Sequence, residues 1–137
     1  MQAYEKGVVG MKEIIACIRR HQVPATKKAL EEAGFPALTI QSIEGRGKQY
    51  GIGGWEAEVD PELNKVLGSQ QVIEARINWI PKRMLTLIVQ DQEVESAVKA
   101  ITEINKTGHC GDGKIFVCPL HEVVRVRTGE AGREAVL

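Results

Sequence analysis

The chain has 137 residues, of which 43 % are hydrophobic, 26 % charged and 4 % aromatic. This length and composition predict one domain with a real core and exclude a disordered chain. Lys plus Arg and Asp plus Glu number 18 each, so the formal net charge is zero, whereas a general nucleic-acid binder would show a basic surplus. No apolar run reaches the roughly 18 residues of a membrane helix, so we expect no membrane insertion. The odd number of cysteines, Cys17, Cys110 and Cys118, favours a reducing cytoplasm over a disulfide scaffold.

The first half of the chain predicts a strand, a helix and a second strand. Apolar residues alternate over Lys12–Arg19, which is typical of a strand. Pro24 suits the first turn of a helix, and Gly34 supplies a C-terminal stop. The alternation returns at Leu38–Ile43, which predicts the second strand.

The second half of the chain predicts a third strand, a second helix and two short strands. Arg83–Val89 is almost continuously apolar and predicts a third strand. Asp91 is expected to cap the second helix, whose apolar stripe covers Val94–Ile104. Two short strands are expected at Lys114–Cys118 and, as an extra one at the end, Val123–Arg127.

The order β-α-β-β-α-β predicts a ferredoxin-like α+β sandwich, with both helices on one face of an antiparallel sheet. Three of the strands are apolar in both registers, because Ile15, Ile88 and Phe116 each neighbour a core candidate in the chain. Two helices cover only one face of a sheet, so the other face needs a second apolar surface. We therefore expect a homo-oligomer.

One connection is out of proportion to the rest. Gly45–Pro81 links the second and third strands, far beyond the two to five residues of a usual hairpin loop. Such long connections in compact domains are usually functional or mobile.

A glycine-rich segment, Gly108–Lys114, follows the second helix. It matches the Gly-x-x-x-x-Gly-Lys of a nucleoside triphosphatase loop, but Ile115 replaces the magnesium-binding Ser or Thr, and the loop runs from helix to strand instead of strand to helix. Gly111 and Gly113 would still free backbone amides to bind phosphate oxygens, and Lys114 adds a positive charge. An ordinary glycine turn is the alternative, and the loop alone does not decide between the two.

Further cations stand near predicted strand ends. Arg125 and Arg127 are two residues apart and would share one face of a strand. Gly45–Gln49, with Lys48, forms another cationic turn, and Lys82 lies at the far end of the long connection. Several such elements in a chain of zero net charge indicate one polyanion site.

Catalytic candidates are few. His21, His109 and His121 are scattered, with no nucleophile or carboxylate partner in the sequence. His109 and Cys110 are adjacent, which is not the spacing of a tetrahedral metal site. The sequence therefore favours binding over catalysis, and a slow ATPase is disfavoured. An RNA-recognition module shares the element order, but it needs aromatic residues on its central strands, and Met84–Val89 has none.

Three motifs together resemble the P-II nitrogen-regulatory family. Thr107–Val117 resembles the C-terminal signature of that family, and Arg125–Glu130 resembles the end of its last core strand. Gly45–Gln49 stands where these proteins carry the motif that begins a long loop, the T-loop. The similarity covers residues 11–137, leaves residues 1–10 as an N-terminal extension, and puts the T-loop at about 47–81. The Gly45–Gln49 motif and the residues after Pro81 look most like the nitrogen-fixation branch, which regulates nitrogenase.

The resemblance implies a trimer, formed alone or with a paralogue, that binds ATP or ADP between subunits together with Mg²⁺ and 2-oxoglutarate. Gln49 and Lys82 match positions for 2-oxoglutarate, and Gln49 also matches the position for the metal. The protein would not be an enzyme but would control a partner through the T-loop, with nitrogenase as the expected target and an ammonium transporter or another metabolic enzyme as the alternative. The nucleotide-binding residues implied by the family are Thr39, Gly45, Gly47, Lys48, Ile88, Gly111, Asp112, Gly113, Lys114, Arg125 and Arg127.

Overall fold

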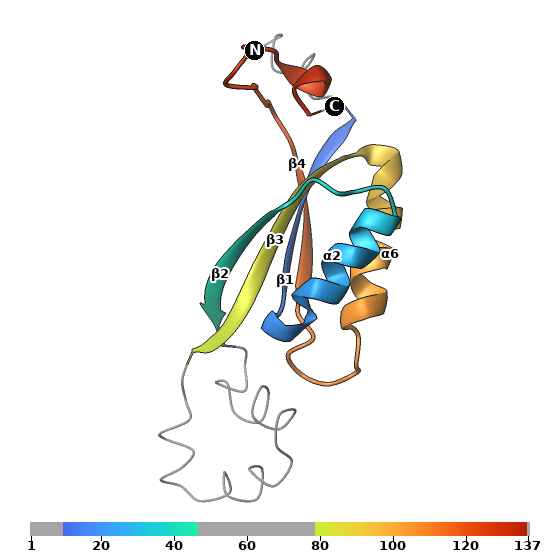
Figure 1. Ribbon diagram of the computed structural model, residues 1–137, viewed down its shortest axis with the longest axis vertical. Coiled ribbons are helices and arrows are strands. Elements are labelled where there is room, and N and C mark those ends of the chain that lie inside the picture. Colours follow the sequence, from blue (N-terminus) through green and yellow to red (C-terminus); the bar gives the residue numbers. More distant parts are fainter. Residues whose placement is uncertain (1–9, 47–78, 137) are drawn as a thin grey trace, which may run out of the picture.

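The computed structural model describes residues 10–46 and 79–136. In this part of the chain, four antiparallel strands form one sheet in the order β2-β3-β1-β4, and two helices cover one of its faces (Figure 1). This confirms the expected ferredoxin-like α+β fold. The elements are β1 (Met11–Arg19), η1 (Arg20–Gln22), α2 (Val23–Glu32), β2 (Thr39–Gly45), β3 (Ile80–Gln90), η2 (Asp91–Glu93), α6 (Val94–Asn105), β4 (Lys114–Pro119) and η3 (Gly132–Ala135).

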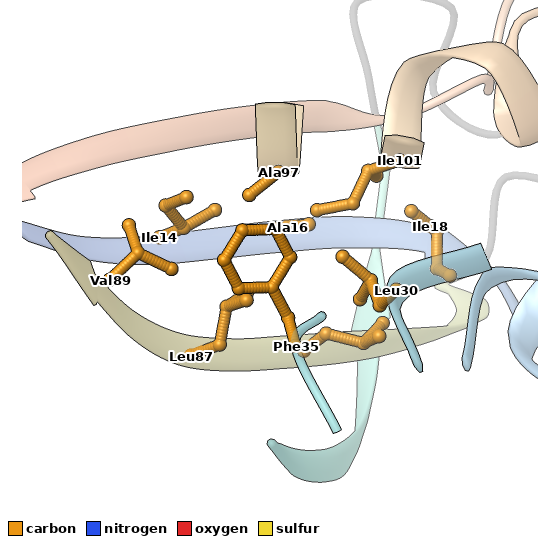
Figure 2. Packing of buried hydrophobic residues seen from close by; sticks show 10 residues of the cluster. Ile14, Ala16, Ile18, Leu30, Phe35, Leu87, Val89, Ala97 and Ile101 are labelled. Atoms are coloured by element: carbon orange, nitrogen blue, oxygen red, sulfur yellow. The ribbon is translucent and has the colours of Figure 1, made fainter. Parts of the chain in front are cut away.

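The hydrophobic core lies between the sheet and the two helices. Alternate residues of the central strands β1 and β3 point toward the helices, and Phe35, which follows α2, lies across the middle of the cluster (Figure 2). Burial of this apolar surface is the main stabilising contribution to such a domain. The buried cluster contains Ile14, Ala16, Ile18, Leu30, Phe35, Leu85, Leu87, Val89, Ala97 and Ile101.

The other face of the sheet also carries apolar side chains, as the pattern predicted. Ile15 is in register with Phe116 on β4, and Ile88 projects to the same face from β3. Both described helices lie on the opposite side (Figure 1), and Phe116 is 49 % exposed. Within the part of the chain that the structure describes, neither helix covers this surface, which we call the open face.

The end of α2 follows its sequence signal closely. Gly34 has a φ of +96°, and its N–H donates to the Glu31 carbonyl at 3.0 Å. The Phe35 N–H donates to the Leu30 carbonyl at 2.7 Å. These two bonds form a Schellman cap, which satisfies carbonyls that the helix end would leave unpaired and turns Phe35 into the core.

The expected cap of the second helix is wrong in detail. A 3-10 turn, η2, precedes α6, and its cap is Gln90, whose N–H donates to Glu93 Oε1 at 2.9 Å. Asp91 instead pairs with Lys12 at 2.5 Å. The reciprocal Gln90–Glu93 arrangement caps η2, and α6 continues from this turn without a side-chain cap of its own, so Asp91 caps neither element.

The expected strand at Val123–Arg127 is also wrong. Val124 forms a single bridge with Ala131, and the residues between them make a turn, in which the Gly129 N–H donates to the Arg125 carbonyl at 2.8 Å. No further strand partner pairs with this segment within the described residues. The alternation of residues 123–127 was therefore a local pattern without a neighbouring strand to pair with.

The two ends of the long connection lie side by side. Gly45, the last residue of β2, is in register with Ile80, the first residue of β3, so β3 begins inside the stretch expected to belong to the T-loop. The Arg46 guanidinium stands over the Trp79 ring at 5.1 Å from its centroid, a cation–π contact. The residues that flank the connection, Arg46 and Trp79, are therefore held next to each other.

In residues 10–46 and 79–136, no helix combines the length and the apolar character that crossing a membrane requires.

Candidate functional site

The segment between α6 and β4, residues 106–113, lies where several predicted site residues meet, and we call it the glycine loop. Gly111 and Gly113 have φ values of +98° and +113°, which residues with a Cβ rarely adopt. A Cβ on Gly113 would come within 2.0 Å of the Cys17 carbonyl oxygen. The loop backbone therefore packs directly on β1, and glycine is required at position 113 for both reasons.

A single carboxylate organises this loop. The Asp112 Oδ2 atom accepts the N–H of Thr107 at 2.8 Å and the N–H of Gly108 at 2.9 Å. The Oδ1 atom accepts the Thr107 hydroxyl and also Arg19 Nη1, at 2.7 Å. Burial by itself raises the pKa of the Asp112 carboxyl, but the hydrogen bonds and the ion pair outweigh burial and lower the pKa well below its usual range. Asp112 is thus a carboxylate at all ordinary pH values.

Two cationic side chains of the sheet donate hydrogen bonds to carbonyl groups of the glycine loop. Arg19 and Lys82 are in register on β1 and β3 and project to the open face. Arg19 is only 3 % exposed, and its Nη2 donates to the Cys110 carbonyl at 3.0 Å. Lys82 Nζ donates to the Gly111 carbonyl at 2.6 Å. The sequence prediction included Lys82 but missed Arg19, whose only signal was a charged residue ending an apolar strand.

Sequence reasoning also missed Thr107, which lies inside the quoted motif but had no role there. Its backbone and its hydroxyl both donate to Asp112. A Thr five residues before an Asp, with glycines between them, is a local pattern that can close a loop through side-chain to backbone bonds.

The structure brings part of the predicted set together. Lys82 and the glycine loop with Asp112 meet at one end of the sheet, and Lys114 begins β4 directly after the loop. Thr39 is in register with Thr86 on the open face, which Ile88 shares on the same strand. Gly45 ends β2 near the same end of the sheet as the loop (Figure 1). Gly47, Lys48 and Gln49 lie outside the described residues.

Arg125 and Arg127 are not near the glycine loop of their own chain. The segment that follows β4 lies at the opposite end of the sheet, beside the end of β3 (Figure 1), where Arg133 donates to Gln90. Arg125 bonds Glu130 at 2.9 Å and the Glu134 carbonyl at 2.9 Å, while Arg127 is exposed in a turn. Because the strand is absent, the expectation that both guanidiniums share one strand face is wrong.

No cluster of three or more His, Cys, Asp or Glu side chains with metal-site geometry occurs in residues 10–46 and 79–136. The residue expected to engage magnesium, Gln49, lies outside those ranges. The described loop is instead suited to anions, because it combines left-handed glycines, Lys82 and Lys114.

The fold and the loop thus define a ferredoxin-like domain with a glycine-rich, cationic end. The family model for nitrogen regulatory protein P-II matches residues 11–130, so the chain belongs to the P-II family. P-II proteins are regulatory signal-transduction proteins and not enzymes, which makes this chain a regulator.

Relatives and a solved structure agree with this assignment. The "nitrogen fixation nifHD region glnB-like protein 2" of Methanococcus maripaludis is 49 % identical over 127 residues, which is 92 % of this chain and 100 % of the relative. Its counterpart in Methanobacterium ivanovii is 45 % identical, over 93 % of this chain and 100 % of the relative. The crystal structure of Arabidopsis thaliana PII bound to citrate aligns with a TM-score of 0.65 at 27 % identity, over 92 % of each chain. The names of the relatives match the nitrogen-fixation branch that the motifs indicated.

Proposed function

We propose that this protein reports nitrogen status by binding ATP or ADP, Mg²⁺ and 2-oxoglutarate, and that it controls a partner protein, nitrogenase, through residues 47–81 in the cytoplasm. The observation that carries the proposal is the glycine loop, fixed by Asp112 and flanked by Lys82 and Lys114. Such a loop offers backbone amides and positive charge to phosphate oxygens. Nitrogenase as the target is inferred from the relatives, whose names refer to a nitrogen-fixation nifHD region.

The nucleotide would be shared between two subunits of a trimer. One subunit would supply Gly111, Gly113 and Lys114, and its neighbour Arg125 and Arg127. Two observations support this division: the segment after β4, which carries both arginines, lies at the other end of the sheet from the glycine loop (Figure 1), and the open face carries apolar side chains that neither helix covers. Thr39, Gly45, Gly47, Lys48 and Ile88 would line the rest of the nucleotide pocket.

2-Oxoglutarate would bind beside the phosphates through Gln49 and Lys82. The dianion needs a cation, and Lys82 Nζ lies at the open face, where its present acceptor is the Gly111 carbonyl. The solved relative from Arabidopsis thaliana binds citrate, which also carries several carboxylates. Mg²⁺, held in part by Gln49, would supply a positive charge that carboxylate and phosphate oxygens share.

Calorimetry tests the proposal. The full chain should bind 2-oxoglutarate only in the presence of ATP and Mg²⁺. Lys82→Ala and Gln49→Ala should abolish this response while leaving measurable ATP binding, because the nucleotide keeps its other contacts. Lys99→Ala is the matched control, since Lys99 is an exposed lysine on α6 that pairs only loosely with Glu103, at 3.8 Å. Binding of 2-oxoglutarate without nucleotide, or an unchanged response in Lys82→Ala, would contradict the proposal.

A capture experiment identifies the partner. The protein should retain nitrogenase from an extract in one ligand state and release it in the other, with ATP present and 2-oxoglutarate added or omitted. Capture of an ammonium transporter or of another metabolic enzyme instead would replace nitrogenase as the target while leaving the ligand sites intact.

A further inference from the structure

We propose that Arg19 and Asp112 are positioning residues for the phosphate site: their ion pair holds the glycine loop in its binding conformation, and the Asp112 carboxylate does not touch the ligand. This inference rests on the proposed function, because it concerns how the same loop binds phosphate. It also changes the role expected of Asp112, which the family resemblance places among the nucleotide contacts.

The hydrogen-bonding capacity of Asp112 supports this inference. An ionised carboxylate has about four acceptor positions. In Asp112, Oδ1 accepts from Arg19 and from the Thr107 hydroxyl, and Oδ2 accepts from the amides of Thr107 and Gly108. All four positions therefore serve the chain itself, and none is left for a phosphate-bound metal or for a ribose hydroxyl.

Charge gives a second argument. A carboxylate in the middle of a phosphate-binding loop would repel its ligand unless a cation compensated it. The Arg19 side chain is 4 % exposed, and its Nη1 lies 2.7 Å from Asp112 Oδ1, so the compensation takes place inside the protein, where salt screens it little. Because Arg19 compensates Asp112, the positive charge of Lys114, which is exposed, then acts on the ligand without net opposition from the loop.

The geometry of Arg19 explains why it is an arginine. Its Nη1 binds Asp112, and its Nη2 binds the Cys110 carbonyl at 3.0 Å, so one planar group ties two points of the loop to the end of β1. A lysine has one donor atom on a flexible stem and would not hold both acceptors in a fixed geometry. The guanidinium therefore sets the shape of the loop as well as its charge.

A double-mutant cycle on the full chain tests the inference. Asp112→Asn and Arg19→Met should each lower ATP affinity by about tenfold, which is at the lower end for the loss of a charged hydrogen bond. Adenosine affinity should stay the same, because the nucleoside does not need the loop. The double variant should bind ATP no worse than the weaker single variant, since both changes release the same loop. Arg19→Lys should recover part of the loss.

Hydrogen exchange supplies a readout that is independent of ligand. In Asp112→Asn and Arg19→Met, the amides of Thr107 and Gly108 should exchange faster, while the core amides of Ile14 and Leu85 keep their protection. Asp91→Asn is the matched control, because Asp91 is also a carboxylate in an ion pair, with Lys12, but lies away from the loop. It should change neither ATP affinity nor exchange in the loop.

Two results would overturn the inference: an Asp112→Asn variant that keeps full ATP affinity, or a double variant whose loss equals the two single losses combined, which would indicate independent contacts with ligand. A wild-type chain that binds no ATP would instead refute the proposed function. In that case the exchange measurement would still decide whether Arg19 and Asp112 hold the loop.

Discussion

Gly113 shows how closely one residue can be constrained by its surroundings. Its φ of +113° excludes most side chains, and the Cys17 carbonyl oxygen lies 2.0 Å from where a Cβ would stand. Gly108, in the same loop, also has a positive φ, +88°, but no atom of the described residues lies within 4 Å of its Cβ position. Substitutions at these two glycines therefore distinguish the cost of backbone strain from the cost of a steric clash.

Gly113→Ala should lower the free energy of unfolding by about 2 kcal/mol or more, because strain and clash combine, and should abolish ATP binding. Gly108→Ala should lower the free energy of unfolding by only about 1 kcal/mol, which is the cost of the left-handed conformation alone. Urea denaturation and calorimetry with ATP measure both effects. Equal stabilities for the two variants would show that β1 shifts to make room and that the close packing is unimportant.

At the level of elements, local signals decided helix ends when they involved a special backbone conformation. Gly34 ends α2 because the chain must reverse there with φ +96°. Asp91 had a suitable side chain for a cap, but β3 is followed by the turn η2, which Gln90 and Glu93 cap before α6 begins. Residues 123–127 had the pattern of a strand, but among residues 10–46 and 79–136 they form only the single bridge from Val124 to Ala131.

The cap of α2 gives a prediction for this scale. Gly34→Ala should lower the free energy of unfolding by about 1 kcal/mol, because alanine strains the left-handed conformation that the Schellman cap requires. Among the described residues, no atom lies within 4 Å of the Cβ position, so the expected cost is backbone strain. Gly34→Asn should lower the free energy of unfolding by less, since asparagine tolerates this conformation better than alanine does. Urea denaturation of the three proteins checks the order, and an alanine variant as stable as wild type would contradict it.

For the whole molecule, the open face is the feature that a single chain leaves unexplained. Phe116 and Val117 are neighbours on β4 and are exposed to 49 % and 44 %. Phe116 projects to the open face, whereas Val117 projects to the side of the helices, as Ile115 does. A substitution at Phe116 therefore tests the assembly of subunits, and the same substitution at Val117 is its control.

Phe116→Glu should convert the proposed trimer to monomers and weaken ATP binding, because a charge would be buried between subunits and the contacts from Arg125 and Arg127 of the neighbouring subunit would be lost. Val117→Glu should leave the assembly intact. Light scattering after gel filtration should give three times the 15.1 kDa of the chain for wild type and for Val117→Glu. Dissociation of both variants, or of Val117→Glu alone, would move the interface to another surface.

The sequence by itself determined the order of strands and helices, the two apolar faces of the sheet and the glycine-rich loop, because periodicity and glycine conformation are local properties of a chain. It also predicted one polyanion site from Lys82, the loop, Lys48 and the two arginines, of which the structure of a single chain brings Lys82 and the loop together. The tertiary structure decided which charges act together. Arg19 enters the site only because β1 and β3 bring it beside Lys82 under the loop, and Asp112 points inward only because Arg19 and Thr107 are there to bind it. The segment that carries Arg125 lies away from the loop because β4 takes the chain to the other end of the sheet (Figure 1). Distances between residues remote in the sequence cannot be read from a local pattern.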